Sequence, residues 1–410
     1  MRRFLFIASV CIWMVGKADL PPGSFSTLFI SKTTEAVLSP DGQSLFSVEG
    51  EKVVQWEIRT GRRVREYQGH KGMVLCIAVA PDGRRLYSAG ADGQVLAWEI
   101  PAGRILSARP LPSEAWALAV ANQYLATGLS NGEVFILDAN ELTVLLKLST
   151  ESPGILSLAL GQEGLAGGGS DGKLYFWQLP AGGRIGSFLA HNGPIWAVAF
   201  GPGYVATASG DRTVRIWAFP GGQLLKTLAG YKGTVWDLAC LAEGSFLVTA
   251  SGDLTVRLWD VAKGEEVGTL RAHAAAVRAV SALPARNLFL TSSEDGKIVI
   301  WDLNALLSLR PKVVQAFYTR EITQSQYILV SFADANGDVI GVKLVVEEKH
   351  VGTVRITPGI SFDPQVRGRS QGSFGFTVSV SRPQQVSITV ILTDATGLMS
   401  PPFLISFTVR

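Results

Sequence analysis

The chain has 410 residues, of which 47% are hydrophobic and 17% are charged, and its formal net charge is +3. This length is sufficient for two or three domains, and the apolar fraction is sufficient for a large buried core. Because Arg2, Arg3 and Lys17 supply three of the positive charges, the chain beyond residue 18 is close to neutral. A nearly neutral chain argues against binding of nucleic acid, which requires a concentrated basic surface.

The N-terminal residues have the pattern of a secretory signal. A basic start precedes the apolar run 4–16, and the small residues Gly16 and Ala18 stand at its end. We therefore expect residues 1–18 to be a signal peptide that is cleaved after Ala18. The alternatives are a buried N-terminal element and a lipoprotein modified at Cys11.

The apolar run is too short to span a bilayer comfortably, and no later stretch is long and apolar enough to do so. We therefore expect no integral membrane span. The mature protein is expected to be soluble and exported, either to the periplasm or to the cell surface and medium. Association with the cell envelope is left open.

Seven similar segments follow one another between residues 24 and 303. Each contains an alternating apolar run that ends at an anchoring tryptophan or, once, a leucine. The anchors are Trp56, Trp98, Leu137, Trp177, Trp217, Trp259 and Trp301. Successive anchors are 42, 39, 40, 40, 42 and 42 residues apart, which indicates a repeat architecture.

Each segment has the same order of strand and turn signals. An apolar strand, a glycine or proline turn and a strand of small residues precede a second turn, the alternating strand and a fourth strand. The second turns carry Asp92, Asn131, Asp171, Asp211, Asp253 and Asp295. Four short strands in about 40 residues are the pattern of a β-propeller blade. The sequence therefore predicts an all-β protein with a seven-bladed propeller over residues 24–309.

The repeats resemble the WD40 family. The Trp-Asp dipeptide that names the family, and its Gly-His dipeptide, carry the resemblance together with the turn aspartate. Matches and near matches are Trp259-Asp260, Trp301-Asp302, Gly69-His70, Ala190-His191 and Ala272-His273. The resemblance implies that a histidine, a second-strand hydroxyl, the turn aspartate and the anchoring tryptophan of one blade form a hydrogen-bonded network.

The resemblance implies three such networks by position. They would consist of His70, Ser88, Asp92 and Trp98; of His191, Thr207 or Ser209, Asp211 and Trp217; and of His273, Thr291 or Ser293, Asp295 and Trp301. Blade six has Tyr231 in place of histidine, blade one lacks the turn aspartate, and blade three has Leu137 for tryptophan. These three blades are expected to depend more on packing than on a network. We interpret the repeated aspartate as architectural, because a catalytic aspartate would not need copies in six blades.

A strand at each end of the repeat region competes to complete the last blade. The apolar stretch 25–31 stands at the same offset before its blade as the fourth strands of other blades, and it would close the ring. The rival is 304–309, which would supply the strand from the C-terminal side. We favour the N-terminal strand.

The pattern changes at residue 311, and tryptophan no longer occurs beyond it. Alternating runs such as SFGFTVSVS and VSITVILTD predict antiparallel strands over residues 312–410. Their number fits a small β-sandwich that resembles immunoglobulin-like modules.

The segment 327–348 contains two alternating runs around Asn336-Gly337, which predicts a β-hairpin. Asp334 and Asp338 stand on either side of this turn, and their carboxylates could bind a calcium ion. The spacing lacks the glycine and the terminal glutamate of an EF-hand loop, so we favour a plain turn.

Catalytic motifs do not stand out. Three of the four histidines belong to the repeats, and the fourth is His350. Glu347 and Glu348 are interpreted as a solvated strand end. The glycine-rich stretch 165–172 lacks the Lys-Ser/Thr ending of a phosphate loop and leads into a strand. We predict no catalytic residue and no enzyme, although a site assembled from loops around the propeller channel remains an alternative.

Two cysteines stand beyond the signal segment, Cys76 and Cys240, each within an apolar run. Buried thiols that behave as small hydrophobic groups fit this setting. Neither a disulfide framework nor metal-ligand spacing is present, so we expect no metal and no cofactor.

A second set of residues recurs at the start of the first strands. It consists of Leu75, Trp116, Trp196, Trp236 and Arg278, with Ser157 approximately equivalent in blade four. The resemblance implies that this position faces the rim of the channel, where partners of the family bind. Tryptophan and arginine dominate the energy of many interfaces, so we predict a recognition surface here. The alternative is that these side chains only fill gaps between blades.

Three functions follow from these expectations. We favour a non-catalytic exported scaffold that binds a protein or peptide partner on the propeller face. A cell-wall or glycan binder is the second, because exposed tryptophans also stack on sugars. An enzyme with a site in the channel is the third and least favoured.

Overall fold

The structure is a computed structural model that describes residues 24–29, 35–162, 164–309, 312–317, 321–322, 325–333, 339–346, 354–357, 371–380, 384–394, 398–400 and 403–409. The predicted signal segment 1–18 lies outside these residues. The chain divides into two compact units. The first is Met1–Glu265 with Arg271–Leu303, and the second is Glu266–Leu270 with Asn304–Arg410.

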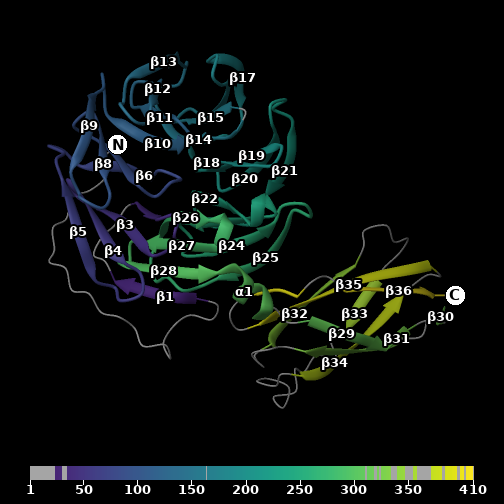
Figure 1. Cartoon of the computed structure of the whole chain (residues 1–410). Helices are drawn as coiled ribbons and strands as arrows, with labels where there is room; N and C mark the ends of the chain where they lie inside the picture. Colours follow the sequence, from purple (N-terminus) through teal and green to yellow (C-terminus); the bar gives the residue numbers. More distant parts are fainter. Residues whose placement is uncertain are drawn as a thin grey trace. The chain divides into compact units, whose positions relative to one another are not determined.

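Seven four-stranded sheets follow one another around a ring as seven blades (Figure 1). Blade one consists of β2 (Ala36–Leu38), β3 (Ser44–Glu49), β4 (Lys52–Glu57) and β5 (Arg63–Gln68). Blade two consists of β6 (Val74–Val79), β7 (Arg85–Gly90), β8 (Gln94–Glu99) and β9 (Ile105–Pro110). Blade three consists of β10 (Ala115–Ala121), β11 (Tyr124–Leu129), β12 (Glu133–Asp138) and β13 (Val144–Ser149).

The remaining blades repeat this order. Blade four consists of β14 (Ile155–Leu160), β15 (Gly164–Gly169), β16 (Lys173–Gln178) and β17 (Gly183–Leu189). Blade five consists of β18 (Ile195–Gly201), β19 (Tyr204–Ser209), β20 (Val214–Ala218) and β21 (Leu224–Leu228). Blade six consists of β22 (Val235–Leu241), β23 (Phe246–Ser251), β24 (Val256–Asp260) and β25 (Glu265–Leu270). Blade seven has β26 (Val277–Leu283), β27 (Leu288–Ser293), β28 (Lys297–Asp302) and β1 (Ser24–Phe29). Short 3₁₀ turns, η2 (Ala242–Gly244) and η3 (Pro284–Arg286), follow β22 and β26.

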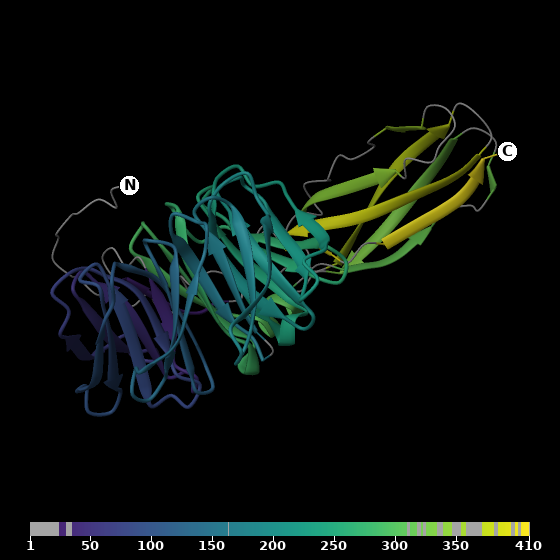
Figure 2. The same ribbon diagram turned by 90° about the horizontal axis from the view of Figure 1, so that it is seen from above.

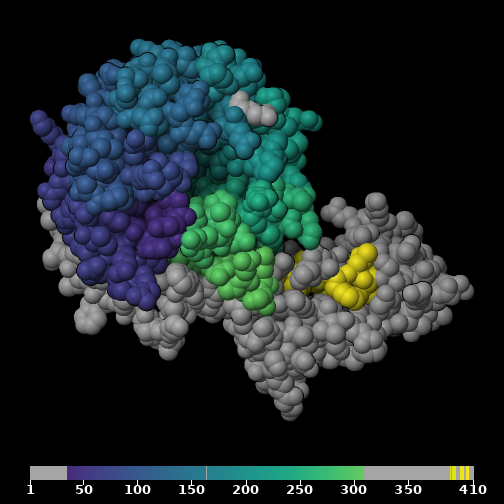
Figure 3. Space-filling view, in the orientation of Figure 1, coloured from purple at the N-terminus to yellow at the C-terminus, as the bar shows by residue number. Residues whose placement is uncertain are grey.

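The N-terminal strand closes the ring, as the sequence predicted. β1 pairs antiparallel with β28, and Leu38 of blade one donates its N–H to Ser281 Oγ of blade seven at 3.3 Å. In Figure 3 the purple surface of blade one meets the green surface of blade seven. The rival strand is wrong, because residues 303–309 form the helix α1 (Leu303–Leu309). Pairing both ends of the repeat region in one sheet covers the open edge of β28.

The hydrophobic core lies between neighbouring blades. One cluster joins Phe46 and Val48 of blade one to Leu86, Leu96 and Trp98 of blade two. The anchoring tryptophans are buried in this way in every blade that has one. Figure 2 shows the strands of the first unit crossing the thickness of the ring. Because each sheet has two apolar faces and each face packs on the next blade, the period of about 40 residues specifies the whole ring.

The described residues of the second unit form eight further strands in two four-stranded sheets. One sheet orders β29 (Lys312–Phe317), β31 (Ser325–Ala333), β34 (Gln371–Val380) and β33 (Val354–Thr357). The other orders β30 (Glu321–Ile322), β36 (Phe403–Val409), β35 (Gln384–Asp394) and β32 (Val339–Val346). The pairing is antiparallel except between β30 and β36. The all-β prediction holds for these strands, and the immunoglobulin-like sandwich stays a prediction.

The predicted hairpin around Asn336-Gly337 is wrong. β31 pairs with β29 and β34, whereas β32 pairs with β35 in the other sheet. Alternation along a strand specifies its buried face but not its partner. The turn residues with Asp334 and Asp338, together with Glu347, Glu348 and His350, lie outside the described residues.

Both remaining cysteines are free thiols, with Cys76 buried and Cys240 partly buried. Burial raises the pKa of the Cys240 thiol to about 11. Within the described residues, no helix has the length and hydropathy that crossing a membrane requires.

Candidate functional site

The repeat network forms in blade two as the resemblance implied. His70 Nδ1 lies 3.0 Å from Asp92 Oδ2, and its Nε2 lies 2.7 Å from Ser88 Oγ. Trp98 donates its indole N–H to the same Ser88 oxygen at 2.8 Å. Asp92 also accepts the backbone N–H of Lys71 at 2.9 Å. The network therefore connects the loop before the first strand with the second and third strands.

Blades five and seven contain the same residues with threonine as the hydroxyl, but the contact between histidine and aspartate is longer in blade seven. In blade five, His191 lies 2.9 Å from Asp211 Oδ2 and 2.7 Å from Thr207 Oγ1. In blade seven, the distances from His273 are 3.4 Å to Asp295 Oδ2 and 2.8 Å to Thr291 Oγ1. The indole N–H groups of Trp217 and Trp301 each donate to the threonine at 3.0 Å. The alternatives Ser209 and Ser293 instead accept the backbone N–H of the turn aspartate.

The chemistry of the blade-five network specifies its proton positions. Asp211 only accepts when ionised, so His191 Nδ1 donates to it. Burial lowers the pKa of His191 against the opposing attraction of Asp211, which favours the neutral ring. Neutral Nε2 then accepts the Thr207 hydroxyl proton, and Thr207 accepts the indole N–H of Trp217. Thr207 Oγ1 also lies 3.3 Å from the Arg215 carbonyl, so every polar group of the network has a partner, which specifies a single packing of the blade.

In blades five and seven the fold favours the ionised form of the turn aspartate. Burial raises the pKa of Asp295, but hydrogen bonds from His273 and from the backbone N–H groups of Ala274 and Lys297 outweigh it and lower that pKa to about 2. In Asp211, hydrogen bonds from Thr213 and His191 likewise outweigh burial, and the pKa is lowered. A carboxylate stabilised in this way has no tendency to take up a proton, which fits an architectural role.

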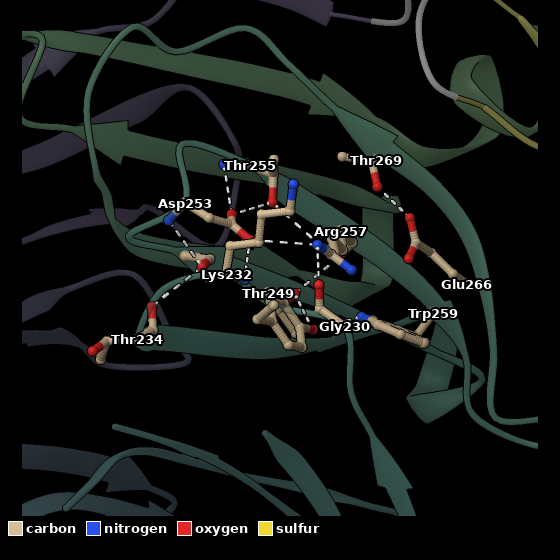
Figure 4. Close-up of polar contacts among 12 residues, drawn as sticks. Gly230, Lys232, Thr234, Thr249, Asp253, Thr255, Arg257, Trp259, Glu266 and Thr269 are labelled. Atoms are coloured by element: carbon tan, nitrogen blue, oxygen red, sulfur yellow. Dashed lines mark hydrogen bonds and ion pairs between the residues drawn. The ribbon is translucent and has the colours of Figure 1, made fainter. Parts of the chain in front are cut away.

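Blade six has its own network, so the expectation that it depends mainly on packing is wrong. Trp259 donates its indole N–H to the Tyr231 hydroxyl at 2.7 Å, and that hydroxyl lies 2.8 Å from Thr249 Oγ1. Thr249 in turn donates to the Arg257 carbonyl at 3.3 Å. Tyrosine spans the gap that histidine would fill, because its hydroxyl both accepts and donates. Figure 4 shows these contacts around Thr249 and Trp259.

Arg257 takes the place of histidine as the side-chain partner of the turn aspartate. Its guanidinium lies 3.4 Å from Asp253 Oδ2 and donates to the Gly230 carbonyl at 2.9 Å (Figure 4). It also stacks 4.5 Å from the centre of the Tyr231 ring. Asp253 also accepts the Lys232 N–H at 3.0 Å. Tyrosine and arginine together therefore do what one histidine does in blades two, five and seven.

Replacing Tyr231 with phenylalanine is expected to lower the free energy of unfolding by about 1–3 kcal/mol. The Trp259 indole N–H would lose its buried acceptor while the ring stays in place. Urea unfolding followed by tryptophan fluorescence measures the change. Tyr124→Phe is the matched control, because its hydroxyl accepts only from the exposed Gln123. A loss no larger than that of the control would show that the blade depends on packing alone.

The other exceptions agree better with the sequence. In blade one, Trp56 donates to Ser47 Oγ at 2.8 Å, and Arg63 lies over its ring at 4.8 Å. In blade three, Leu137 is fully buried, and the hydroxyl of Thr127 has no partner within the described residues. These two blades hold together with shorter networks and more packing.

The first strands of blades two to seven all begin with a β-bulge. Pairing with the second strand skips one residue, which is left unpaired at the rim. The skipped residues are Leu75, Trp116, Leu156, Trp196, Trp236 and Arg278. The equivalent in blade four is therefore Leu156, and Ser157 is wrong by one residue. A bulge turns a side chain away from the regular alternation, and all six are partly exposed.

Three of the predicted residues lie in contact across blades five to seven. The rings of Trp196 and Trp236 are 5.0 Å apart at 53°, and the Arg278 guanidinium lies 4.0 Å from the centre of the Trp236 ring. Arg278 also donates to Glu294 Oε1 at 2.8 Å. We call Trp196, Trp236, Arg278 and Glu294 the Trp–Arg ladder.

Trp116 and Leu75 are at the same register but outside the ladder. The Trp116 indole N–H donates to Glu114 Oε2 at 3.1 Å. A Cβ placed on Gly154 of the next blade would lie 2.7 Å from the Trp116 ring, so this ring covers a glycine of blade four. The structure therefore brings together three of the five predicted residues.

Sequence reasoning missed Asp237, which follows Trp236 in β22. Its Oδ1 accepts the Leu238 N–H at 2.8 Å, and its Oδ2 accepts the Val280 N–H of blade seven at 2.7 Å. Burial raises the pKa of this carboxyl to about 7, although solvent reaches part of the residue. The signal was present, because the other bulged strands have cysteine, alanine or serine at this register.

Within the described residues, no group of three or more His, Cys, Asp and Glu side chains could hold a metal ion. The arrangement of the ladder offers aromatic faces and one guanidinium. It is suited to contact with another molecule.

The ring of seven four-stranded sheets defines a seven-bladed β-propeller. The family signature described as "WD domain, G-beta repeat" matches residues 61–99, 182–218, 222–260 and 264–302. The chain is also similar to "Protein groucho" of Drosophila melanogaster, with 30% identity over 153 residues. The match covers 36% of this chain and 21% of that protein, so the matched part is about a fifth of the relative. Propellers of this family generally bind proteins and are non-catalytic.

Proposed function

We propose that this chain is a non-catalytic scaffold that binds a protein or peptide partner on its propeller face. The carrying observation is the Trp–Arg ladder, in which two indole rings and a guanidinium are partly exposed and in mutual contact. These are the side-chain types that dominate interface energies. Trp116 and Leu75 would extend the same surface along the rim.

The rim position does not require tryptophan for packing. Blades two and four have Leu75 and Leu156 at the same bulge, with the same register and the same partial exposure. An aliphatic side chain is therefore sufficient to fill the space between blades at this position. Two adjacent blades with tryptophan, followed by one with arginine, favour a surface that is used for recognition.

Changing Trp196 and Trp236 to leucine together is expected to abolish partner capture while the ring remains folded. Leucine is the residue of blades two and four, so the packing requirement stays met. Full-length chain and variant, immobilised at equal density, would be compared for proteins retained from an envelope extract and for binding to a glycan array. Proteins retained only by the unchanged chain support the proposal. Unchanged capture with a lowered Tm would favour the packing role, and glycan binding without protein partners would favour a cell-wall binder.

We also propose export, which rests on the N-terminal signal pattern with its basic start and apolar run 4–16. The partner would then be found in the periplasm or outside the cell. N-terminal sequencing of the chain isolated from its own cells tests this. A start at Asp19 supports export, and an intact apolar run in the mature chain contradicts it.

A further inference from the structure

The turns beside the ladder carry large side chains in a left-handed backbone conformation. Arg212 in blade five has φ +68°, and Leu254 in blade six has φ +71°. Blades two, three, four and seven have glycine at this turn position, namely Gly93, Gly132, Gly172 and Gly296, all with positive φ. Only glycine adopts this conformation without strain. Blades five and six therefore accept strain at a position where glycine is available.

These same two blades carry Trp196 and Trp236. In both, a glycine stands two residues before the strained residue, at Gly210 and Gly252. A Cβ on Gly252 would lie 3.1 Å from Trp236 Nε1, and one on Gly210 would lie 3.4 Å from Trp196 Nε1. The glycine leaves space for the indole ring. Two residues later, Arg212 or Leu254 presents a long side chain to solvent.

Leu254 is 42% exposed, and Arg212 is also exposed. Neither side chain has a hydrogen bond or an ion pair recorded in the described part of the chain. Strain without a compensating contact inside the protein points to a contact outside it. The exposed leucine stands two residues after Gly252, the glycine that faces Trp236, and adds apolar surface to this turn.

The charge of this surface is positive. Arg278 lies against the Trp236 ring, and the exposed Arg212 follows Gly210, the glycine that faces Trp196. The exposed Lys232 lies in the loop before β22. Asp211 and Asp253, the turn aspartates of these two blades, already bind His191 and Arg257 within the blade networks. Glu294 is an exposed carboxylate, with 51% of its side chain accessible, and it is already paired with Arg278, whereas the exposed Glu114 lies against Trp116, outside the ladder. Glu294 stands where a carboxylate of another molecule would bind.

We infer that the Trp–Arg ladder, with Arg212 and Leu254, binds an extended peptide segment in which a carboxylate side chain stands next to an aliphatic or aromatic one. The acidic side chain displaces Glu294 from Arg278, and the apolar side chain packs between Leu254 and the indole rings. The inference rests on the proposed function and specifies its partner. Charge complementarity selects the carboxylate, and the exposed apolar surface supplies affinity.

The test uses a phage-displayed library of random dodecapeptides selected on the full-length chain. Enriched peptides are expected to combine Asp or Glu with a neighbouring Leu, Ile, Phe or Trp. Binding of one such synthetic peptide is then measured by fluorescence anisotropy. Arg278→Gln is expected to weaken it about tenfold, whereas Glu294→Gln is expected to tighten it severalfold, because the internal competitor is removed. Leu254→Gly is expected to weaken binding without lowering the Tm.

The matched control is Arg104→Gln, which breaks an exposed ion pair of 2.6 Å with Glu99 in the turn between β8 and β9. It should leave peptide binding unchanged. Enriched peptides without acidic residues that still depend on Trp236 would overturn the inference and leave the proposed function standing. If no enriched peptide loses binding when Trp196 and Trp236 are changed to leucine, both are overturned. Weaker binding by Glu294→Gln would show that Glu294 orders Arg278 for the partner, against the inferred displacement.

Discussion

Replacing Asp253 with alanine is expected to lower the free energy of unfolding by about 3–5 kcal/mol. The carboxylate is nearly buried, with 7% of its side chain exposed, and it accepts the N–H groups of Lys232 and Thr255. Arg257 would lose its carboxylate partner in a place where only 12% of its side chain reaches solvent. Removing one member of a buried charged network leaves the others desolvated without compensation.

Urea unfolding at several pH values measures this effect. Burial raises the pKa of Asp253, but hydrogen bonds from Thr255 and the Lys232 N–H outweigh it, and the net pKa is lowered. The stabilisation is therefore present above the ordinary carboxyl pKa near 4 and is lost as pH falls through the lowered value. The difference between the two proteins should narrow in acid.

Asp260→Ala is the matched control for Asp253→Ala. Asp260 belongs to the same blade and accepts the Lys263 N–H at 3.0 Å, but its pair with Lys263 Nζ is long, at 3.7 Å, and exposed. The expected loss is below about 1 kcal/mol. Equal losses for the two variants would contradict the assignment of Asp253 to a buried network.

The ring could be predicted because one short rule repeats along the chain. Each anchor such as Trp98 fills the space against the next blade, and each turn aspartate such as Asp92 must stand six residues before it. The offset of 25–31 from its blade predicted that the N-terminal strand closes the ring. These features are local in sequence, and the same packing is selected seven times.

Chemical substitution within a network was harder to predict. Tyr231 does not resemble histidine, and the partner that makes it sufficient, Arg257, stands in another strand. Only the fold shows that the Tyr231 hydroxyl reaches Thr249 while Arg257 takes over the contact with Asp253. The replacement of histidine by Tyr231 is visible in the sequence, but the compensating role of Arg257 is not.

Strand register was the other source of error. The bulge at the start of each first strand skips a residue, so Leu156 and not Ser157 stands at the rim of blade four. The partners of β31 and β32 could not be predicted. A strand shows the same alternation of apolar and polar residues whether it pairs with its neighbour in sequence or with a distant strand. Trp196, Trp236 and Arg278, which lie in contact at the bulges of blades five to seven, could be singled out because these residue types recur at a fixed offset, and their role in recognition stays a prediction. Arg212 and Leu254 were not, because their backbone conformation leaves no mark in the sequence.

Asp237→Ala is expected to remove a pH dependence of stability on the order of 3 kcal/mol between about pH 4 and pH 7. Burial raises the pKa of Asp237 from 3.8 to about 7 in the folded chain. Over this range the unfolded chain has lost the proton while the folded chain keeps it. The folded state then binds more protons, so stability falls as pH rises from 4 to 7 and is level above it.

Alanine suits this position, because blades three, five and seven have Ala117, Ala197 and Ala279 at the same register. Chemical unfolding of both proteins from pH 4 to pH 8 gives the difference, in which the titration of all other groups cancels. The variant should be less stable than the unchanged chain at pH 4, where the protonated carboxyl lies between Leu238 and Val280, and should match or exceed it at pH 8. A difference that does not change with pH would mean that Asp237 is already ionised in the fold. The carboxyl joins blades six and seven through Leu238 and Val280, close in sequence to Trp236 and Arg278. Measuring peptide affinity over the same pH range shows whether the titration of Asp237 affects the ladder. If it does, the affinity changes with pH in the unchanged chain and not in the variant.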